Sequence, residues 1–112
     1  MRRSKYGNKK VQADGKKFDS QKEFRHYLKL KNLAAEGKIY GLTCQVPFHF
    51  PVNGEALKYI DSNRKIKYIA DFEYFTPEGK RVIEDVKGFK TRDYLIKKAL
   101  MYSCHKVIIQ EV

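Results

Sequence analysis

The stretch YIADFEYFTPEGKRVIEDVKG, residues 68–88, contains two apolar, β-forming segments that flank a Pro-Glu-Gly turn. Proline at the second turn position and glycine at the fourth favour a three-residue hairpin loop, in which a type I turn ends in a left-handed residue. The stretch therefore predicts a β-hairpin with Thr76 opposite Lys80. Aspartate is depleted in strands, so the acids within both segments need a separate explanation.

The register of this hairpin decides which acids share a face of the sheet. With residues 77–79 as the loop, Asp71 is opposite Asp85, whereas a two-residue loop would place it opposite Glu84. In the first register Asp71, Asp85 and Lys87 share one face. Opposed carboxylates repel each other, and apolar neighbours make their burial costly, so a cation is expected between them. We interpret the pair as a divalent-metal site; the alternative is an Asp–Lys–Asp ladder that is only structural.

The remaining sequence predicts an α/β domain whose core order is helix, three strands, helix, strand. Ser20 or Asp19 caps a first helix that Gly37 ends, and Thr91 caps a second helix. The last strand–helix–strand unit is a crossover, so its two strands should be parallel. Three further segments complete the pattern: a small hairpin around Asp14-Gly15, a strand within residues 41–52 that Pro47 places near a sheet edge, and a final strand within residues 105–112.

Glu23 lies on the apolar face of the first predicted helix, beside Tyr27 and Leu30. The pattern Ser20-x-x-Glu23 matches a capping box, in which the glutamate side chain bonds back to the amide of the cap residue. The helix alone favours this capping role.

The charge of the chain indicates a polyanionic partner. Lys and Arg total 24 against 13 Asp and Glu, a formal net charge of +11 in 112 residues. Nucleic acid is the first candidate, and the alternative is a protein that is basic without a specific partner. The two cysteines, Cys44 and Cys104, lack metal-ligand spacing. There is no apolar segment of membrane-spanning length and no signal-peptide pattern, so we expect an intracellular protein without a membrane partner.

An aspartate followed, after a short hairpin, by an acid-x-Lys motif resembles the PD-(D/E)xK signature of the restriction-endonuclease-like nucleases. Asp71 corresponds to the first acid and residues 85–87 to the (D/E)xK motif, while Ala70 replaces the motif's proline. The segments KYGNKK, DGKKFDSQKE, YIADFEY and VIEDVKG are similar to a phage and prophage family, domain of unknown function 1064, which is grouped with very-short-patch-repair-like endonucleases. The resemblance covers nearly the whole chain, as one nuclease-like domain over residues 1–112 whose N-terminal residues 1–10 are basic.

The resemblance implies a restriction-endonuclease-like core, with a mixed central sheet flanked by helices, and Mg²⁺-dependent hydrolysis of DNA, for which Mn²⁺ can substitute. Asp71, Asp85 and Glu23 would be metal ligands, with the backbone carbonyl of Val86 as a further one, and Lys87 would act in catalysis. This role for Glu23 reverses the preference for a cap. Two residues are candidates for supporting the site: Glu84 and Gln45.

The resulting hypothesis is an endodeoxyribonuclease that selects branched or junction DNA in the cytoplasm of a phage-infected or lysogenic bacterium. The alternative is a non-catalytic nucleic-acid-binding domain on the same fold. A homodimer would suit a two-fold junction. Phosphate contacts position a nucleic acid without reading its sequence, and we assign them to positive charge outside the hairpin: Lys90, Arg92, Lys97, Lys98, Arg2, Arg3, Lys5, Lys9 and Lys10.

Overall fold

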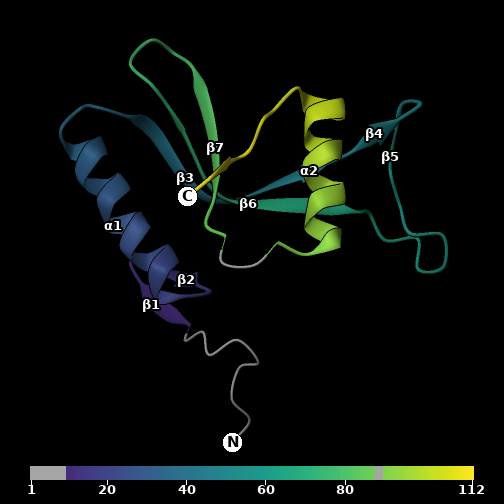
Figure 1. Cartoon of the computed structure of the whole chain (residues 1–112), viewed down its shortest axis with the longest axis horizontal. Coiled ribbons are helices and arrows are strands. Elements are labelled where there is room, and N and C mark those ends of the chain that lie inside the picture. Colours follow the sequence, from purple (N-terminus) through teal and green to yellow (C-terminus); the bar gives the residue numbers. More distant parts are fainter. Residues whose placement is uncertain (1–9, 88–89) are drawn as a thin grey trace, which may run out of the picture.

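The computed structural model describes residues 10–87 and 90–112 (Figure 1). It is an α/β structure in which two helices flank a mixed four-stranded sheet. In chain order these elements are α1 (Gln21–Ala35), β3 (Tyr40–His49), β6 (Lys67–Phe75), β7 (Arg81–Asp85), α2 (Arg92–His105) and β8 (Gln110–Glu111). Two small hairpins lie outside the sheet, β1 (Val11–Ala13) with β2 (Lys16–Phe18) and β4 (Pro51–Val52) with β5 (Glu55–Ala56).

The strands of the main sheet are ordered β3-β6-β7-β8. The predicted order of helix, three strands, helix and strand is therefore observed, with β3 at an edge, where Pro47 is tolerated. The pair β7 and β8 is parallel, as expected for a crossover, and the other two pairs are antiparallel. β8 is shorter than expected because it pairs only with the last two residues of β7. This short ladder supports the strand end that leads to Lys87.

The hairpin of β6 and β7 has the predicted register. The amide of Thr76 donates to the carbonyl of Lys80 at 2.9 Å, and Gly79 closes the loop in the left-handed region with φ 86°. Phe72 is paired with Glu84. One step further along both strands, Asp71 therefore lies opposite Asp85, as the three-residue loop predicts.

The local signals at the helix ends and in the first hairpin are also confirmed. Ser20 and Thr91 are the N-caps of α1 and α2, and each side chain accepts an amide hydrogen bond from the first turn. Gly37 follows α1 with φ 73°, and the Asp14-Gly15 turn has positive φ at both residues. In the part of the chain that the structure describes, no helix is both long and apolar enough to cross a membrane.

Each helix covers its own side of the sheet (Figure 1). Tyr27 and Leu30 of α1 pack in a cluster with Phe72, whereas Tyr94 and Met101 of α2 pack in a second cluster with Ile83. Phe72 is opposite Glu84, the neighbour of Ile83, so Phe72 and Ile83 point to opposite faces. The sheet is thus buried on both sides, and its acids are placed between two apolar layers.

β6 is irregular at Asp71. Ala70 packs in the cluster under α2 although Phe72, two residues later, packs in the cluster under α1. The pairs Cys44–Phe72 and Val46–Ala70 place Gln45 opposite Asp71, and Gln45 has a positive φ of 55°. A non-glycine residue in this region is strained and is more common at functional sites than elsewhere. The strict alternation assumed from the sequence therefore ends at the acidic pair.

Candidate active site

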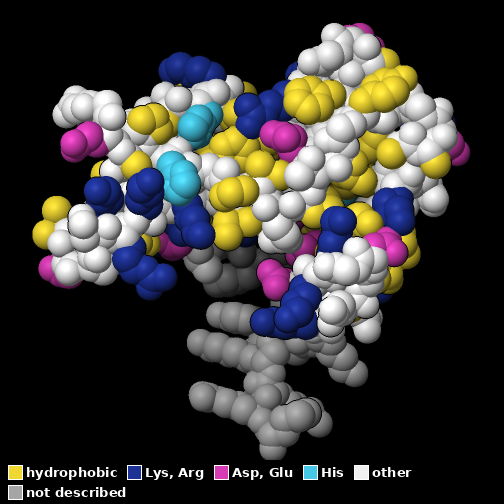
Figure 2. Space-filling model, turned by 180° about the vertical axis from the view of Figure 1, so that it is seen from behind, with side chains coloured by type: hydrophobic (Ala, Val, Ile, Leu, Met, Phe, Trp, Pro, Cys, Tyr) yellow, Lys and Arg dark blue, Asp and Glu magenta, His cyan; other side chains and the backbone are white. Residues whose placement is uncertain are grey.

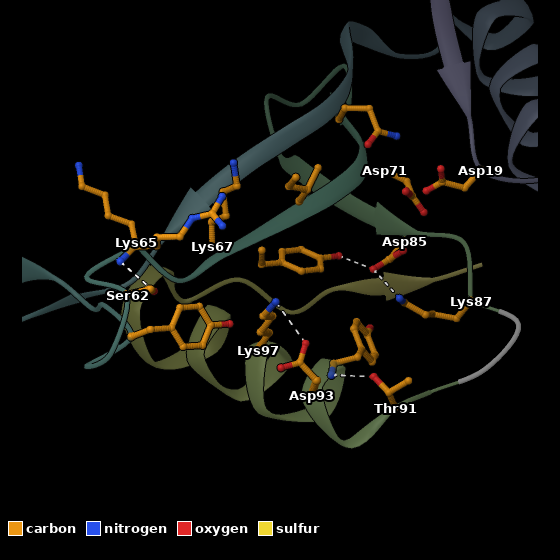
Figure 3. Close-up of a pocket in the computed structure, with 16 residues that line it drawn as sticks. Asp19, Ser62, Lys65, Lys67, Asp71, Asp85, Lys87, Thr91, Asp93 and Lys97 are labelled. Atoms are coloured by element: carbon orange, nitrogen blue, oxygen red, sulfur yellow. Dashed lines mark hydrogen bonds and ion pairs between the residues drawn. The ribbon is translucent and has the colours of Figure 1, made fainter. Parts of the chain in front are cut away.

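Asp71 and Asp85 form a buried carboxylate pair on adjacent strands, at one end of a cleft (Figure 3). The amide of Val86 donates to Asp71 Oδ2 at 2.8 Å, and the hydroxyl of Tyr68 donates to Asp85 Oδ2 at 2.6 Å. Each carboxylate is thus held by one donor from the sheet itself. The carboxylates of Asp71 and Asp85 therefore point toward each other and not toward solvent.

The electrostatics of the pair favour a bound cation. Burial raises the pKa of Asp71 strongly, and a hydrogen bond with Asp85 together with repulsion from Asp85 and Glu23 raises it further. With no metal, Asp71 therefore retains its proton well above the pH at which an exposed aspartate loses it. The retained proton offsets the negative charge of the buried pair. A metal ion can supply this positive charge instead, and it displaces the proton when it binds.

Lys87 lies beside the pair, as predicted. Its Nζ is 3.3 Å from Asp85 Oδ2 and 4.0 Å from the centroid of the Tyr94 ring. The backbone from Asp85 to Lys87 is held by Val112, which directly follows β8: Val112 donates to Asp85 O and accepts from the Lys87 amide. The ammonium group is therefore fixed between a carboxylate and an aromatic face, where it is a preorganised positive charge.

The structure separates the two roles proposed for Glu23. Its backbone amide donates to Ser20 Oγ at 3.1 Å and so completes one half of the cap. Its buried carboxylate accepts from Gln45 Nε2 at 3.0 Å, across to β3. Burial, followed by repulsion from Asp19, raises the pKa of Glu23 to about 7. The carboxylate thus belongs to the electrostatic environment of the acids, and the bond to the Ser20 hydroxyl uses only the backbone of Glu23.

The residues that the structure describes contain no group of three His, Cys, Asp or Glu side chains arranged to hold a metal ion. Glu23 raises the pKa of Asp71, but it does not complete such a group with the pair. Asp71 and Asp85 alone still offer the donor type that Mg²⁺ prefers, because Mg²⁺ is commonly bound through one or two carboxylates and keeps several waters. The two-carboxylate pair fits that mode.

Glu84 points away from this pair and connects the sheet to α1. It is buried, its Oε1 is 2.6 Å from His26 Nε2, and its Oε2 accepts from the Tyr74 hydroxyl at 2.6 Å. His26 lies one turn after Glu23 on α1, so this contact helps to position Glu23. The sequence did not indicate this role of His26, since a partner 58 residues away is a matter of tertiary packing.

The cations predicted to bind DNA are in different environments. Lys97 lines the cleft and pairs with Asp93 at 3.2 Å. Lys90 and Lys98 both pair with Glu111, at 2.7 and 2.9 Å, and with Tyr94 they lower the pKa of Glu111 to about 2. Arg92 and Lys10 are exposed and do not line the cleft. Four residues lie outside the described part of the chain: Arg2, Arg3, Lys5 and Lys9.

Several cleft residues were not indicated as functional by the sequence. Tyr68 and Tyr94 contact Asp85 and Lys87, and Asp19 lies at the acidic end (Figure 3). A group of cations lines the other end: Arg64, Lys65 and Lys67. Three cations within residues 64–67 are a visible signal in the sequence, but their proximity to the acids is visible only in the structure.

The chain was compared with known proteins. A model of the family described as "Protein of unknown function (DUF1064)" matches residues 3–110. The chain belongs to this family. The DUF1064 assignment expected from the sequence segments is therefore confirmed. A search of curated proteins and a search of solved structures found no match. Since the description of the DUF1064 family states no activity, the function has to be argued from the site.

The metal-free protein should lose thermal stability as the pH rises from about 4.5 to about 7 and beyond. The folded-state pKa values of Glu23 and Asp71 are both raised, so the folded state binds more protons than the unfolded state in this range. Stability then falls by up to about 1.4 kcal/mol per pH unit for each retained proton. The measurement is a series of thermal melts in EDTA between pH 4.5 and 8.

Two further results belong to this prediction. Glu23→Gln should reduce the slope between pH 4.5 and 7, because an amide has no proton to lose there. Glu111 acts in the opposite sense and only at lower pH, since its pKa is depressed to about 2 and its contribution is lost as the pH falls below about 4.5. A melting temperature that stays constant from pH 4.5 to 8 would contradict the assignment of the two buried acids.

Proposed function

We propose that this protein is a metal-dependent nuclease that hydrolyses phosphodiester bonds of DNA on a restriction-endonuclease-like core. The observation that carries the proposal is the arrangement of Asp71, Asp85 and Lys87 at the acidic end of the cleft. The mixed sheet with the order helix, three strands, helix, strand agrees with the core that the PD-(D/E)xK resemblance implies. The positive net charge suits a polyanionic substrate.

In this proposal Asp71 and Asp85 hold Mg²⁺ or Mn²⁺ through their carboxylate oxygens, with the Val86 carbonyl and Glu23 as further candidates. A bound Mg²⁺ lowers the pKa of a coordinated water and neutralises charge on the phosphodiester. The protein prepares the site beforehand: the Val86 amide orients Asp71, and the Tyr68 hydroxyl orients Asp85. Fixed donors of this kind reduce the reorganisation that binding would otherwise require.

Lys87 supplies the positive charge that the carboxylates lack. Its ammonium group lies beside the pair and remains partly accessible from the cleft. A phosphodiester whose reacting phosphate lies at the acidic end would receive hydrogen bonds from Lys87 to its phosphoryl oxygens. Charge develops on those oxygens in the transition state, so a cation that is already in place stabilises the transition state more than the ground state.

The experiment that tests the proposal is incubation with labelled branched, single-stranded and duplex DNA, in Mg²⁺, in Mn²⁺ and in EDTA. We expect cleavage in either metal, fastest for branched DNA, and none in EDTA. Asp71→Asn, purified in parallel, controls for a contaminating nuclease. Cleavage that persists in EDTA or in Asp71→Asn would refute the proposal.

The second candidate is a nucleic-acid-binding domain without catalysis. It is favoured by one observation, the lack of a three-residue metal group among the described residues. This domain would bind DNA with affinity that falls steeply as salt increases, because phosphate contacts dominate. It would cut none of the substrates in either metal, and Asp71→Asn would leave its behaviour unchanged.

Glu23→Gln should lower the cleavage rate by at least about tenfold while the protein remains folded, a loss typical of groups that support metal ligands. The cap is retained, because it uses the Glu23 amide and the Ser20 hydroxyl. Removal of the buried charge should raise the melting temperature in EDTA at pH 8. The measurements are single-turnover cleavage and thermal melts. An unchanged cleavage rate would limit Glu23 to a structural role.

A further inference from the structure

The cleft that contains the acidic pair has two ends of opposite charge (Figure 3). Asp19, Asp71 and Asp85 lie at one end, and Lys65 and Lys67 lie at the other. Its volume is about 730 Å³, within the range of pockets that enclose one small molecule. A cleft of this size is large enough for a nucleotide, and the charge of its basic end differs from that of the acidic end.

The basic end is built from the loop that follows β5 and from α2. Arg64 and Lys65 come from this loop, and Lys67 is the first residue of β6; we call residues 57–67 the basic arm. Lys97 comes from α2 across the cleft. Arg64, Lys65 and Lys67 form no ion pair within residues 10–87 and 90–112, whereas Lys97 is paired with Asp93. Figure 2 shows several Lys and Arg side chains on and beside the lobe that this part of the chain forms. The arm therefore has positive charge that the fold itself does not neutralise.

The basic arm is held in one conformation without a partner. Its two sides are joined by the Lys58–Lys65 bridge and by the hydrogen bond from the Ile66 amide to Leu57 O. Leu57 and Ile66 pack against the core cluster under α2. At the tip, the Tyr59 amide donates to the Arg64 carbonyl at 2.9 Å. The arm is thus preorganised, which reduces the entropy lost when it binds a ligand.

Tyr59 gives the arm an aromatic surface inside the cleft. The residue lines the cleft beside Arg64 and Lys65, and 50% of its surface is exposed. Proteins that bind single-stranded nucleic acid combine a positively charged groove with aromatic side chains on which bases stack. Paired bases are stacked inside a duplex and cannot reach such a platform, whereas an unpaired base can.

We propose that the basic arm is a binding site for single-stranded nucleic acid, in which Tyr59 stacks on an unpaired base and Arg64, Lys65 and Lys67 contact the adjoining phosphates. The orientation of this strand toward the acidic pair rests on the proposed nuclease function. The arm site and the acidic pair together define the substrate as a strand that is unpaired next to the reacting phosphate, such as a flap or the open arm of a branch. The binding itself does not depend on catalysis.

The test measures binding and cleavage separately with the full chain. Binding is measured in EDTA by fluorescence anisotropy with a single-stranded oligonucleotide that contains 2-aminopurine, with the same sequence as RNA, and with a blunt duplex. Tyr59→Ala should weaken single-strand binding by about tenfold and should abolish the stacking-dependent quenching of 2-aminopurine. Tyr59→Phe should retain both. A double variant, Lys65→Ala with Lys67→Ala, should reduce the salt dependence of binding.

Matched controls use residues outside the cleft. Tyr102→Ala removes a tyrosine of similar exposure from α2, and Lys80→Ala removes an exposed cation from the hairpin turn. Both should bind as the parent does. A Tyr59 effect on either DNA or RNA supports the proposal, and the polymer with the larger effect identifies the substrate. The proposal would be overturned if Tyr59→Ala bound single strands as tightly as the parent does. It would also be overturned if Tyr59→Ala weakened duplex binding as much as single-strand binding.

The two proposals fail in different ways. If no substrate is cleaved but single-strand binding depends on Tyr59, the nuclease function is wrong and the arm site remains. If flapped and duplex DNA are cleaved at equal rates and Tyr59→Ala changes neither rate, the arm proposal is wrong and the nuclease function remains.

Discussion

Asp71→Asn and Asp85→Asn are each expected to lower the rate of Mg²⁺-dependent cleavage by at least about a thousandfold. The two carboxylates act together as one metal site, so the loss of either one removes most of the activity. An amide oxygen is a much poorer partner for a hard cation than a carboxylate. The measurement is single-turnover cleavage of a labelled branched substrate. Both carboxylates are buried, and they lie opposite each other across the hairpin. One of them therefore cannot hold the metal ion in place of the pair.

Asp71→Asn should also stabilise the metal-free protein. Asn at position 71 can still accept from the Val86 amide and can donate to Asp85, which replaces the Asp71 proton and removes the repulsion. Melting temperatures in EDTA at pH 8 should therefore rise by roughly 4 °C or more, the shift that about 1 kcal/mol produces in a small domain. Mg²⁺ should raise the melting temperature of the parent but not of either variant. Loss of activity combined with a gain of stability cannot be explained by unfolding.

Glu84→Gln is the matched control, because Glu84 is adjacent to Asp85 in sequence and equally buried but points to the other face. This variant should stay active within about threefold, a change that corresponds to less than 1 kcal/mol, and circular dichroism confirms its fold. If Glu84→Gln is inactive while Asp85→Asn is active, the assignment of the second acid is wrong.

Lys87→Ala is expected to lower the cleavage rate by about 10²- to 10³-fold, the range observed for removal of one preorganised donor from a transition-state site. The Nζ position between Asp85 and the Tyr94 ring is set by the fold and not by the substrate. Because Lys87 acts on the phosphate and not on the ion, the Mg²⁺-induced rise in melting temperature should be retained. The two readouts together separate loss of catalysis from loss of metal binding.

Lys87→Arg and Lys97→Ala are informative comparisons for this prediction. Arginine keeps the charge but has a planar, larger head group, so Lys87→Arg should recover only part of the rate. Lys97 lines the same cleft but is paired with Asp93, and its removal should change binding more than turnover. If Lys87→Ala abolishes the Mg²⁺-induced stabilisation as completely as Asp71→Asn does, Lys87 supports metal binding and the proposed catalytic role is wrong.

The sequence by itself determined the features that depend on neighbouring residues. Pro77 and Gly79 select the three-residue loop, and the loop selects the register that places Asp71 opposite Asp85. Ser20 and Thr91 set the helix starts, and the parallel last strand follows from the crossover. These signals are local or depend on chain connectivity, so they do not require knowledge of the packing.

Only the tertiary structure decided the environment of these residues. The Glu23 carboxylate contacts Gln45, and Glu84 contacts His26, because α1 packs against a sheet formed later in the chain. Glu111 pairs with Lys90 and Lys98, while the basic arm retains its charge and lies at the other end of the cleft from the acids. These contacts join residues far apart in sequence, and their partners are set by the packing of whole helices and strands, which no local pattern of residues specifies.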